Sequence, residues 1–244
     1  MGWEALSAWG EDAVRIKRLA GGSVNDVWSV RVGGKLAVAR LGTRDDADLE
    51  WEADLLLHLD RSGLAVPAPI PTSDGRLFTD GLVVMQYMEG DPPRSAADWR
   101  RVAETLREVH RLTEGWPQRP GWLGATDLIE ADTGMRINLD AMPNEAVARC
   151  RAAWARLRGR EIRVVHGNPT NPANIRMNAE RVALIDWDEA HLDVPDLDLV
   201  LSYNAAELAA GPYDTAAQAS AAWEAAICWK DDYAVSQLAQ VRPV

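Results

Sequence analysis

The apolar positions in the first third of the chain form short runs that predict a small antiparallel sheet. Runs of strand length cover residues 16–19, 27–32, 36–41 and 82–87. Gly33 and Gly34 separate the second run from the third, and a two-glycine connection is typical of a β-hairpin. This part of the chain is therefore expected to be rich in β-structure.

A helical period replaces the strand pattern in most of the remaining chain. Apolar residues recur at helical spacing over residues 46–59, 97–112, 145–157 and 197–240. Residues 113–144 are rich in Gly, Pro and Trp and have no clear period, so we expect a loop-rich insertion there. Two short apolar runs, over 162–165 and 182–185, predict strands that bracket a polar loop.

The two patterns meet at residues 88–93, where Met-Glu-Gly-Asp-Pro-Pro ends the last strand of the first part. We therefore predict an α+β protein with two lobes. Residues 1–88 would form a small β-rich lobe with one helix, and residues 89–244 would form a mostly helical lobe. A chain of 244 residues is long enough for this arrangement.

The composition is that of an ordinary globular protein. No apolar stretch approaches the ~20 residues of a membrane span. The N-terminal segment has no basic start followed by a long apolar run, so a cytoplasmic location is expected. Cys150 and Cys228 both lie in helical patterns without metal-ligand spacing, which argues against a disulfide framework or a zinc site. Both cysteines are expected to be small core residues.

The charge is unevenly distributed along the chain. The net charge is −11, which disfavours nucleic acid or an anionic membrane as the main partner. Residues 182–244 carry 11 acidic and 2 basic side chains, whereas the remainder is nearly neutral. Two interpretations remain open, namely a solvated acidic surface and a cleft that attracts a cationic ligand.

Two segments of the second part carry candidate chemistry. One is His-Gly-Asn-Pro-Thr-Asn-Pro-Ala-Asn-Ile over 166–175, and the other is Leu-Ile-Asp-Trp-Asp-Glu-Ala over 184–190. The pair resembles the catalytic loop and metal-binding motif of the aminoglycoside phosphotransferase and choline kinase family, which read His-Gly-Asp, with an Asn five residues after the Asp, and Ile-Asp-Trp-Asp/Glu. The β-rich part, the segment 88–93 and Asp-Val-Pro-Asp-Leu-Asp-Leu-Val over 193–200 follow the family's order. The resemblance thus covers nearly the whole chain and implies a two-lobed protein-kinase-like fold.

The resemblance implies a role for each matching residue. Asp186 corresponds to the Mg²⁺ ligand that bridges the nucleotide phosphates, and Asn174 to the second metal ligand. Both side chains offer oxygen donors, which suit a hard cation. His166 corresponds to a residue that fixes the loop, and Asp198 to one that braces it. Phosphoryl transfer depends mainly on positioning and charge neutralisation, so this small set of groups suits the reaction.

The chain departs from the family at the catalytic position. Asn168 stands where the family has its catalytic Asp, and six residues rather than five separate it from Asn174. The alternative alignment, five residues before Asn174, places Pro169 there, so neither register supplies a carboxylate. An asparagine can accept a hydrogen bond from a hydroxyl but cannot take its proton. An inactivating substitution, a weakened enzyme and a natural binding protein are the three explanations.

The first part of the chain supplies candidate nucleotide contacts. Gly21, Gly22 and Ser23 connect the first two predicted strands, where backbone N–H groups could approach phosphates. In kinases a lysine on the third strand contacts the phosphates and pairs with a helical glutamate. The resemblance puts Arg40 at that place and Glu52 opposite it. Arginine keeps the charge but not the geometry of lysine.

Further candidates concern the base and the acceptor molecule. The backbone groups of Gln86 and Met88 correspond to those that pair with a purine edge, with the Met85 side chain either behind the base or simply in the core. Asp188 and Glu189 would face a cationic substrate. Among the tryptophans, Trp116 and Trp122 could stack on a sugar or cover an ammonium, whereas the helical spacing of Trp99, Trp154 and Trp223 predicts core positions.

These observations favour an enzyme that uses ATP, or GTP, with Mg²⁺ to phosphorylate a hydroxyl of a small molecule. The expected acceptor is cationic, either an aminoglycoside-like antibiotic or an amino alcohol, and Asn168, Asp186 and Arg40 would carry the chemistry. A catalytically impaired nucleotide- or ligand-binding protein is the first alternative. A structural partner that only reuses the fold is the second. The sequence does not indicate an oligomeric state.

Overall fold

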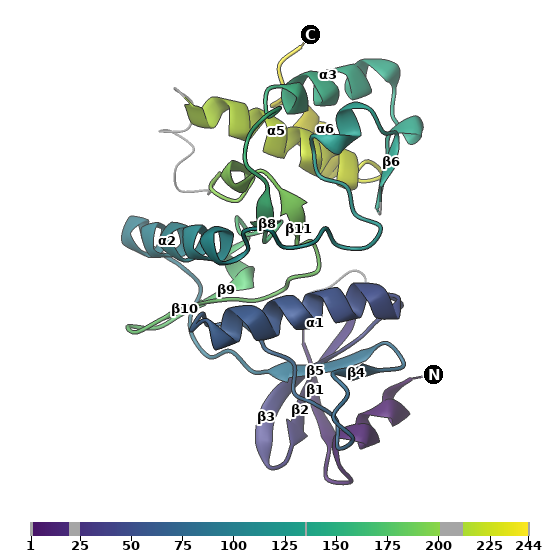
Figure 1. The fold of residues 1–244 in the computed structure, drawn as a ribbon, viewed down its shortest axis with the longest axis vertical. Coiled ribbons are helices and arrows are strands. Elements are labelled where there is room, and N and C mark those ends of the chain that lie inside the picture. The colour runs from purple at the N-terminus through teal and green to yellow at the C-terminus, as the bar shows by residue number, and fades with distance from the viewer. Residues whose placement is uncertain (1, 20–24, 135, 201–211, 244) are drawn as a thin grey trace. The chain divides into compact units, whose positions relative to one another are not determined.

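The computed structural model describes residues 2–19, 25–134, 136–200 and 212–243 (Figure 1). The chain forms two compact units. The first comprises Met1–Pro92 together with Ile175–Ile185, and the second comprises Pro93–Asn174 together with Asp186–Val244. The predicted lobes, 1–88 and 89–244, differ from these units in the placement of residues 89–92 and 175–185. That functional division stays a prediction.

A five-stranded antiparallel sheet forms the centre of the first unit. Its strand order is β1 (Val14–Arg18), β2 (Asp26–Val32), β3 (Lys35–Leu41), β5 (Leu82–Gln86), β4 (Phe78–Thr79). Gly33 and Gly34 have φ values of 53° and 77°, the left-handed backbone that a tight hairpin between β2 and β3 requires. A 3₁₀ helix, η1 (Trp3–Trp9), packs on the sheet through Leu6 and Trp9.

One long helix and a separate hairpin complete the first unit. The helix α1 (Asp46–Arg61) begins at Asp45, whose side chain accepts a hydrogen bond from the Asp48 N–H at 2.8 Å. Its apolar side, which includes Leu55, Leu56 and Leu59, is buried. The hairpin consists of β9 (Ile175–Met177) and β10 (Val182–Leu184), which pair antiparallel.

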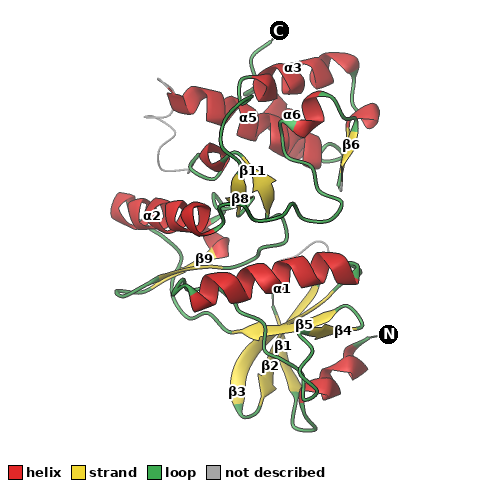
Figure 2. Ribbon diagram, in the orientation of Figure 1, coloured by secondary structure: helices red, strands yellow, loops and turns green. Residues whose placement is uncertain are grey.

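The second unit is mostly helical (Figure 2). Its helices are α2 (Ala96–Leu112), α3 (Asn144–Ala155), α5 (Pro212–Ile227) and α6 (Asp232–Leu238). A reciprocal pair of hydrogen bonds between Ser95 and Asp98 caps the start of α2. Helices α3, α5 and α6 pack around one core that contains Trp154, Trp223 and Leu157. Two short sheets and four 3₁₀ turns lie between these helices in the described part of the chain. The sheets pair β8 (Arg163–Val165) with β11 (His191–Asp193) and β6 (Thr133–Gly134) with β7 (Ile137–Asn138). The turns are η2 (Asp127–Ile129), η3 (Leu139–Ala141), η4 (Pro172–Asn174) and η5 (Pro195–Leu197).

Outside the stretch 197–240, the predicted regular elements are confirmed within a few residues wherever the structure describes them. Within that stretch, residues 198–200 are not helical and a turn at 228–231 separates α5 from α6. The sequence did not predict η1, β4, β9, β11 or the β6–β7 pair, which are short and have no clear period. Residues 201–211, which fell inside a predicted helical stretch, lie outside the described residues. No described helix has the length and apolar character needed to span a bilayer.

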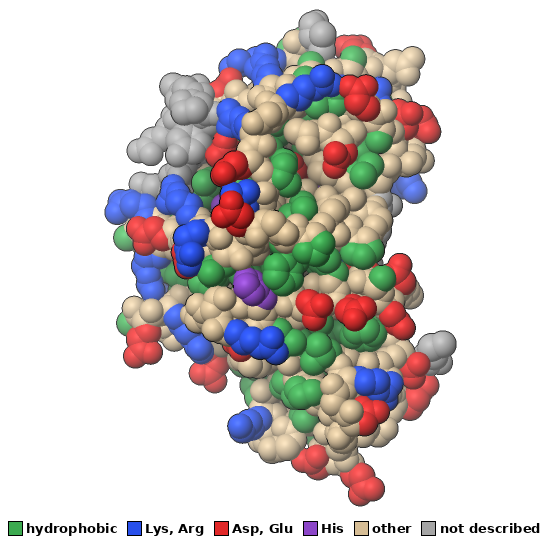
Figure 3. All heavy atoms as spheres, viewed as in Figure 1, with side chains coloured by type: hydrophobic (Ala, Val, Ile, Leu, Met, Phe, Trp, Pro, Cys, Tyr) green, Lys and Arg blue, Asp and Glu red, His purple; other side chains and the backbone are tan. Residues whose placement is uncertain are grey.

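The two cysteines are unpaired, and the charged side chains are mixed by sign on the face shown in Figure 3. Cys150 is fully buried and Cys228 is half-buried; burial raises the pKa of each thiol to about 11. Both are free thiols; Cys150 is a core residue as expected, whereas Cys228 lies only partly inside. On the face drawn in Figure 3, acidic and basic side chains are interspersed over each unit rather than separated by sign.

Candidate active site

The loop that follows β8 depends on a glycine. Gly167 has a φ of 91°, and a Cβ atom there would lie 2.5 Å from the carbonyl oxygen of Glu189. Any other residue would therefore force the two backbone segments apart. This close approach explains why a glycine stands between His166 and Asn168.

The buried carboxylate of Asp198 fixes the backbone of the same loop through hydrogen bonds. Its Oδ2 accepts a hydrogen bond from the His166 N–H at 2.8 Å, and its Oδ1 accepts one from the Gly167 N–H at 3.1 Å. The Nε2 of His110 lies 3.0 Å from Oδ2. Burial alone would raise the pKa of this carboxyl, but the hydrogen bond and charge of His110, with the contacts of His166, lower it below its usual value. The expectation that Asp198 braces the loop is confirmed.

Asn168 and Asn174 are joined across the loop. The side-chain amide of Asn174 donates to the carbonyl oxygen of Asn168 at 3.0 Å, and the Asn168 N–H approaches Nδ1 of His166 at 3.4 Å. Asn168 is half-buried, and its side chain has no hydrogen-bond partner among the described residues. The short turn η4 lies between the two asparagines, where the Asn171 carbonyl accepts from the Asn174 N–H at 3.0 Å. With the six-residue spacing, the Asn174 side chain therefore still fixes the backbone of Asn168.

Asp186 has an unusual backbone conformation. Its φ is 66°, in the left-handed region that non-glycine residues rarely adopt, and the residue is exposed. Such a conformation persists only where the surrounding structure imposes it, and it occurs often at functional sites. The next residue, Trp187, is buried, and its ring lies 4.8 Å from the His166 ring. The two candidate motifs therefore pack against each other within the second unit.

The oxygen donors of this loop pair suit Mg²⁺. The donors are the exposed carboxylate of Asp186 and the amide of Asn174, and Mg²⁺ commonly takes one or two protein oxygens together with phosphate and water. No cluster of three or more His, Cys, Asp or Glu side chains suited to a metal occurs in the described part of the chain. This donor set fits a cation shared with a nucleotide better than a metal enclosed entirely by protein.

The acidic residues that directly follow Asp186 are partly buried, and one of them is ion-paired, rather than fully solvated. Glu189 forms an ion pair of 3.2 Å with Arg136, and burial raises the pKa of Glu189 while Arg136 opposes that rise. Asp188 is half-buried. The acidic segment is thus partly neutralised by a basic residue of the loop-rich insertion, a partner 53 positions away that no local pattern reveals.

Glu224 is a candidate that sequence reasoning missed. It lies on α5 and lines a small cavity together with Gly167, His191 and Asp198. Burial, reinforced by the charge of Glu189, raises the pKa of Glu224 to about 7. Its signal in the sequence was a single acid within the Ala-rich stretch 216–227.

Most of the tryptophans that were considered serve the core. Trp99, Trp154 and Trp223 are buried, as their spacing predicted. Trp122 is also buried, with 4% of its surface exposed, and its ring stacks on His191 at 5.0 Å. The suggestion that Trp122 stacks on a ligand is therefore wrong. Trp116 is half-buried, and its suggested contact stays a prediction.

In the first unit, β3 and α1 are joined by a buried ion pair. Arg40 pairs with Glu52, as predicted, and Arg44 pairs with the other carboxylate oxygen of Glu52. Two guanidinium groups therefore share one carboxylate, and Asp48 lies 3.6 Å from Arg44 as a second acid. Gly21, Gly22 and Ser23, the predicted phosphate loop, lie outside the described residues.

The end of β5 carries the predicted base-binding backbone. The N–H of Gln86 donates to the carbonyl oxygen of Ala68 at 3.0 Å, so that group is already used within the unit. Met85 and Met88 are both buried. The N–H of Gln86 therefore fits the predicted purine contact poorly, and Met88 remains the stronger candidate.

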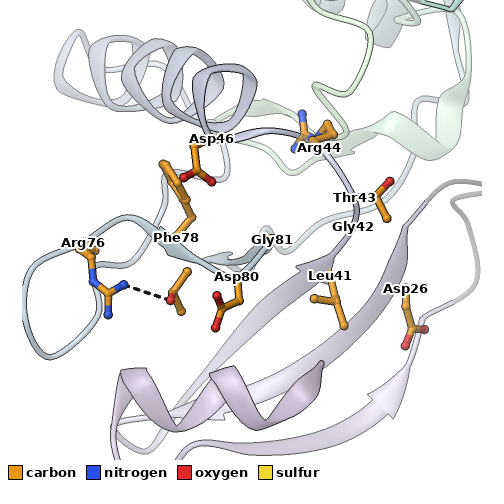
Figure 4. A pocket seen from close by; sticks show the side chains of 11 residues that line it. Asp26, Leu41, Gly42, Thr43, Arg44, Asp46, Arg76, Phe78, Asp80 and Gly81 are labelled. Carbon is orange, nitrogen blue, oxygen red and sulfur yellow. Dashed lines mark hydrogen bonds between the residues drawn. The ribbon is translucent and has the colours of Figure 1, made fainter. Parts of the chain in front are cut away.

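A separate pocket of about 840 Å³ opens in the first unit (Figure 4). It lies between the start of β2, residues 41–44, the start of α1 and the β4–β5 turn. Arg44 and Asp46 are among its lining side chains, and Arg76 donates to Thr79 across its edge at 3.1 Å. Arg40 and Glu52 do not line it. Among the described residues, the lining therefore touches the Arg40–Glu52 pair only through Arg44, which also pairs with Glu52.

Comparison with solved structures confirms the two-lobed protein-kinase-like fold. Aminoglycoside phosphotransferase APH(4)-Ia matches with a TM-score of 0.69 and 16% identity, over 98% of this chain and 95% of that one. Choline kinase LicA from Streptococcus pneumoniae matches with a TM-score of 0.66 and 16% identity, over 98% and 95%. The streptomycin–ATP complex of APH(2″)-IIa matches with a TM-score of 0.61 and 15% identity, over 98% and 94%.

No curated protein matches the sequence. The family model described as the phosphotransferase enzyme family, in contrast, matches residues 15–230, which include both candidate motifs and the Arg40–Glu52 pair. With nearly the whole chain matched, this protein belongs to the phosphotransferase enzyme family.

Proposed function

We propose that the protein transfers the terminal phosphoryl group of ATP, with Mg²⁺, to a hydroxyl of a small cationic molecule. The observation that carries the proposal is the loop 166–174, which Asp198 holds through two backbone hydrogen bonds and which joins Asn168 to Asn174. Membership of a phosphotransferase family supports the reaction class. The nucleotide in the matching APH(2″)-IIa structure supports ATP, with GTP as the alternative.

In this proposal the first unit binds the phosphates. Arg40 would contact them, and Glu52 would fix its guanidinium. The second unit would hold the cation through Asp186 and Asn174. Mg²⁺, when bound, neutralises the charge that develops on the phosphate oxygens.

Asn168 would orient the acceptor hydroxyl. Its side-chain oxygen can accept a hydrogen bond from the hydroxyl, which places the attacking oxygen in line with the phosphorus. The bond from phosphorus to the nucleoside diphosphate breaks as the new P–O bond forms, and the hydroxyl proton leaves to water. Because the transition state is loose, transfer proceeds without a strong base, but more slowly than with one.

Carboxylates close to this loop would recognise the cationic acceptor. Glu224 lines a cavity with Gly167, the residue next to Asn168. Glu189 approaches the same glycine through its backbone. Together with Asp188, these acids would attract an ammonium group, such as those of an aminoglycoside or an amino alcohol.

Asn168 also favours the alternative function, a protein that binds nucleotide or ligand without transferring phosphate. One experiment separates the two. Hydroxylated amines are incubated with ATP, Mg²⁺ and either the native protein or Asn168→Asp, and products are read as the mass increase of one phosphoryl group. Transfer by the native protein supports the enzyme. Nucleotide binding without transfer in either form supports the binding protein.

A further inference from the structure

We infer that Gln118 and Arg119, in the loop-rich insertion, position the backbone that follows Asp186 and thereby set the orientation of its carboxylate. The role of that carboxylate in holding the cation rests on the proposed function. The positioning itself rests on hydrogen bonds within the second unit.

Arg119 contacts the segment 187–190 directly. Its side chain is almost fully buried, with 1% of the residue exposed. Its Nη1 donates to the carbonyl oxygens of Trp187 at 3.0 Å, Asp188 at 3.3 Å and Ala190 at 2.8 Å. The guanidinium also lies 5.2 Å from the Trp122 ring centre. The buried guanidinium of Arg119 therefore donates to three backbone carbonyl groups immediately after Asp186, the candidate metal ligand.

Gln118 and His191 complete this set of contacts. Gln118 accepts from the Leu192 N–H at 2.9 Å and donates to the Leu192 carbonyl at 3.1 Å. The same side-chain oxygen accepts from the Arg119 N–H at 2.8 Å, which ties the two residues together. The Nδ1 of His191 lies 2.7 Å from the Glu189 carbonyl. Polar side chains therefore contact the carbonyls of 187–190 and 192, and the Trp187 carbonyl also accepts from the Ala190 N–H at 3.1 Å.

This arrangement explains how Asp186 keeps its left-handed conformation. A positive φ is unfavourable for an aspartate and persists only when neighbouring contacts fix it. The contact at the Trp187 carbonyl lies one peptide beyond Asp186. Residues that orient a metal ligand commonly change metal affinity by ~10- to 100-fold when they are replaced. We expect Arg119 to have an effect of this size.

The test uses Arg119→Met and the milder Arg119→Lys in the full chain. Mn²⁺ is titrated against each protein with a non-hydrolysable ATP analogue and followed by electron paramagnetic resonance. Amide hydrogen exchange is measured at residues 187–192. In Arg119→Met the Mn²⁺ dissociation constant should rise ~10-fold or more, while affinity for the analogue without metal stays unchanged. Exchange at 187–192 should become faster. Arg119→Lys, which keeps the charge but not the planar fork, should lie between Arg119→Met and the native protein.

Arg149→Met is the matched control. Arg149 also donates to backbone carbonyls of the second unit, those of Leu238, at 2.6 Å, and Val241. This variant should lose stability without a change in the Mn²⁺ constant or in exchange at 187–192. Native-like exchange at 187–192 in Arg119→Met overturns the inference, as does a native-like Mn²⁺ constant. If Arg119→Met does not fold, Arg119→Lys decides by the same two readouts. A native protein that binds no Mn²⁺–nucleotide refutes the proposed function, and exchange then decides the positioning role alone.

Discussion

Nε2 of His110 and Oδ2 of Asp198 lie 3.0 Å apart, although the two residues are 88 positions apart in the chain. His110 is in the last turn of α2, and Asp198 directly follows η5. Through the other hydrogen bonds of Asp198, this contact links α2 to the backbone of His166 and Gly167. The position of Asn168 therefore depends on a buried carboxylate that lies about 30 positions further along the chain.

Replacing Asp198 with Asn should destabilise the protein by ~1–3 kcal/mol at pH 7, because an amide replaces the buried carboxylate that accepts hydrogen bonds from the His166 and Gly167 N–H groups. The pKa of Asp198 is lowered in the folded state, so its stabilisation is present above the unfolded value of ~3.9 and is lost as the pH falls through the folded value. The difference between native and variant should therefore shrink below about pH 4. Urea unfolding at pH 7 and at pH 3 measures it.

Glu108→Gln is the control for this experiment. Glu108 pairs with Arg111 on the exposed side of the same helix, so its loss should change stability by less than ~1 kcal/mol. A small effect of Asp198→Asn, similar to that of Glu108→Gln, would show that the buried pair does not hold the loop.

The local part of the fold could be predicted from the sequence because its cause is local. The two-glycine turn needs left-handed backbone at Gly33 and Gly34, which glycine adopts at little cost. The stripe of leucines in α1 has to be buried on one side. The Arg40–Glu52 pair followed from the family resemblance together with the predicted strand and helix.

The rest depends on long-range contacts that no local pattern contains. Glu189 forms an ion pair with Arg136, and the Trp122 ring stacks on His191, each a partner more than 50 positions away. Arg119 gave no signal because a single arginine in an aperiodic segment is usually a surface residue. Short strands such as β11 form only because a distant partner, here β8, lies beside them.

Arg40→Lys and Asp186→Asn should each weaken binding of Mg²⁺–ATP. The lysine keeps the charge but loses the planar fork that Glu52 holds, and the asparagine removes a charged ligand while tolerating the positive φ. We expect a ~10-fold or larger increase in the dissociation constant for each variant. Isothermal titration calorimetry with Mg²⁺ and a non-hydrolysable ATP analogue measures both.

Calorimetry without metal separates the two roles. Arg40→Lys should weaken nucleotide binding with or without Mg²⁺, whereas Asp186→Asn should matter only when the cation is present. Asp188→Asn, two residues further along the same segment, is the control and should bind Mg²⁺–ATP normally. Unchanged affinity in both test variants contradicts the assignment.

Affinity for a cationic acceptor should rise as the pH increases through about 7, the pKa to which burial and the charge of Glu189 raise Glu224. Only the ionised carboxylate attracts an ammonium group, so we expect a gain of roughly tenfold between pH 6 and pH 8. Glu224→Gln should remove most of this pH dependence. The Cys228 thiol, whose pKa burial raises to about 11, stays neutral in this range. Glu145→Gln, an equal charge change at an exposed position of α3, should leave the profile unchanged.

Salt dependence gives an independent check on the acidic residues. Attraction between exposed charges is screened over ~10 Å at 0.1 M salt, so acceptor affinity should fall as salt increases. Neutralising Asp188 and Glu189 together should weaken acceptor binding more than nucleotide binding. A neutral or anionic acceptor that binds best would show that the acidic part of the chain is a solvated surface.

Asn168→Asp should raise the turnover number by ~10²- to 10⁴-fold, the usual contribution of a general base, while the binding constants for nucleotide and acceptor change little. The backbone of residue 168 is already fixed, because its carbonyl accepts from Asn174 and the loop is held by Asp198. The new carboxylate would therefore occupy the place of an amide that has no partner among the described residues. Steady-state kinetics at saturating ATP and Mg²⁺ measure the change.

Asn171→Asp is the matched control, because it adds the same charge to the same loop at an exposed position. It should leave turnover near the native value. Asn168→Asp can raise turnover only if the six-residue spacing leaves the new carboxylate beside the reacting hydroxyl, since a misplacement of about 1 Å can cost ~10²-fold in rate. Equal and fast turnover in the native protein and in Asn168→Asp would mean that no base is needed at residue 168. Slow turnover in both, with normal binding, would mean that the extra residue holds position 168 away from the reacting hydroxyl.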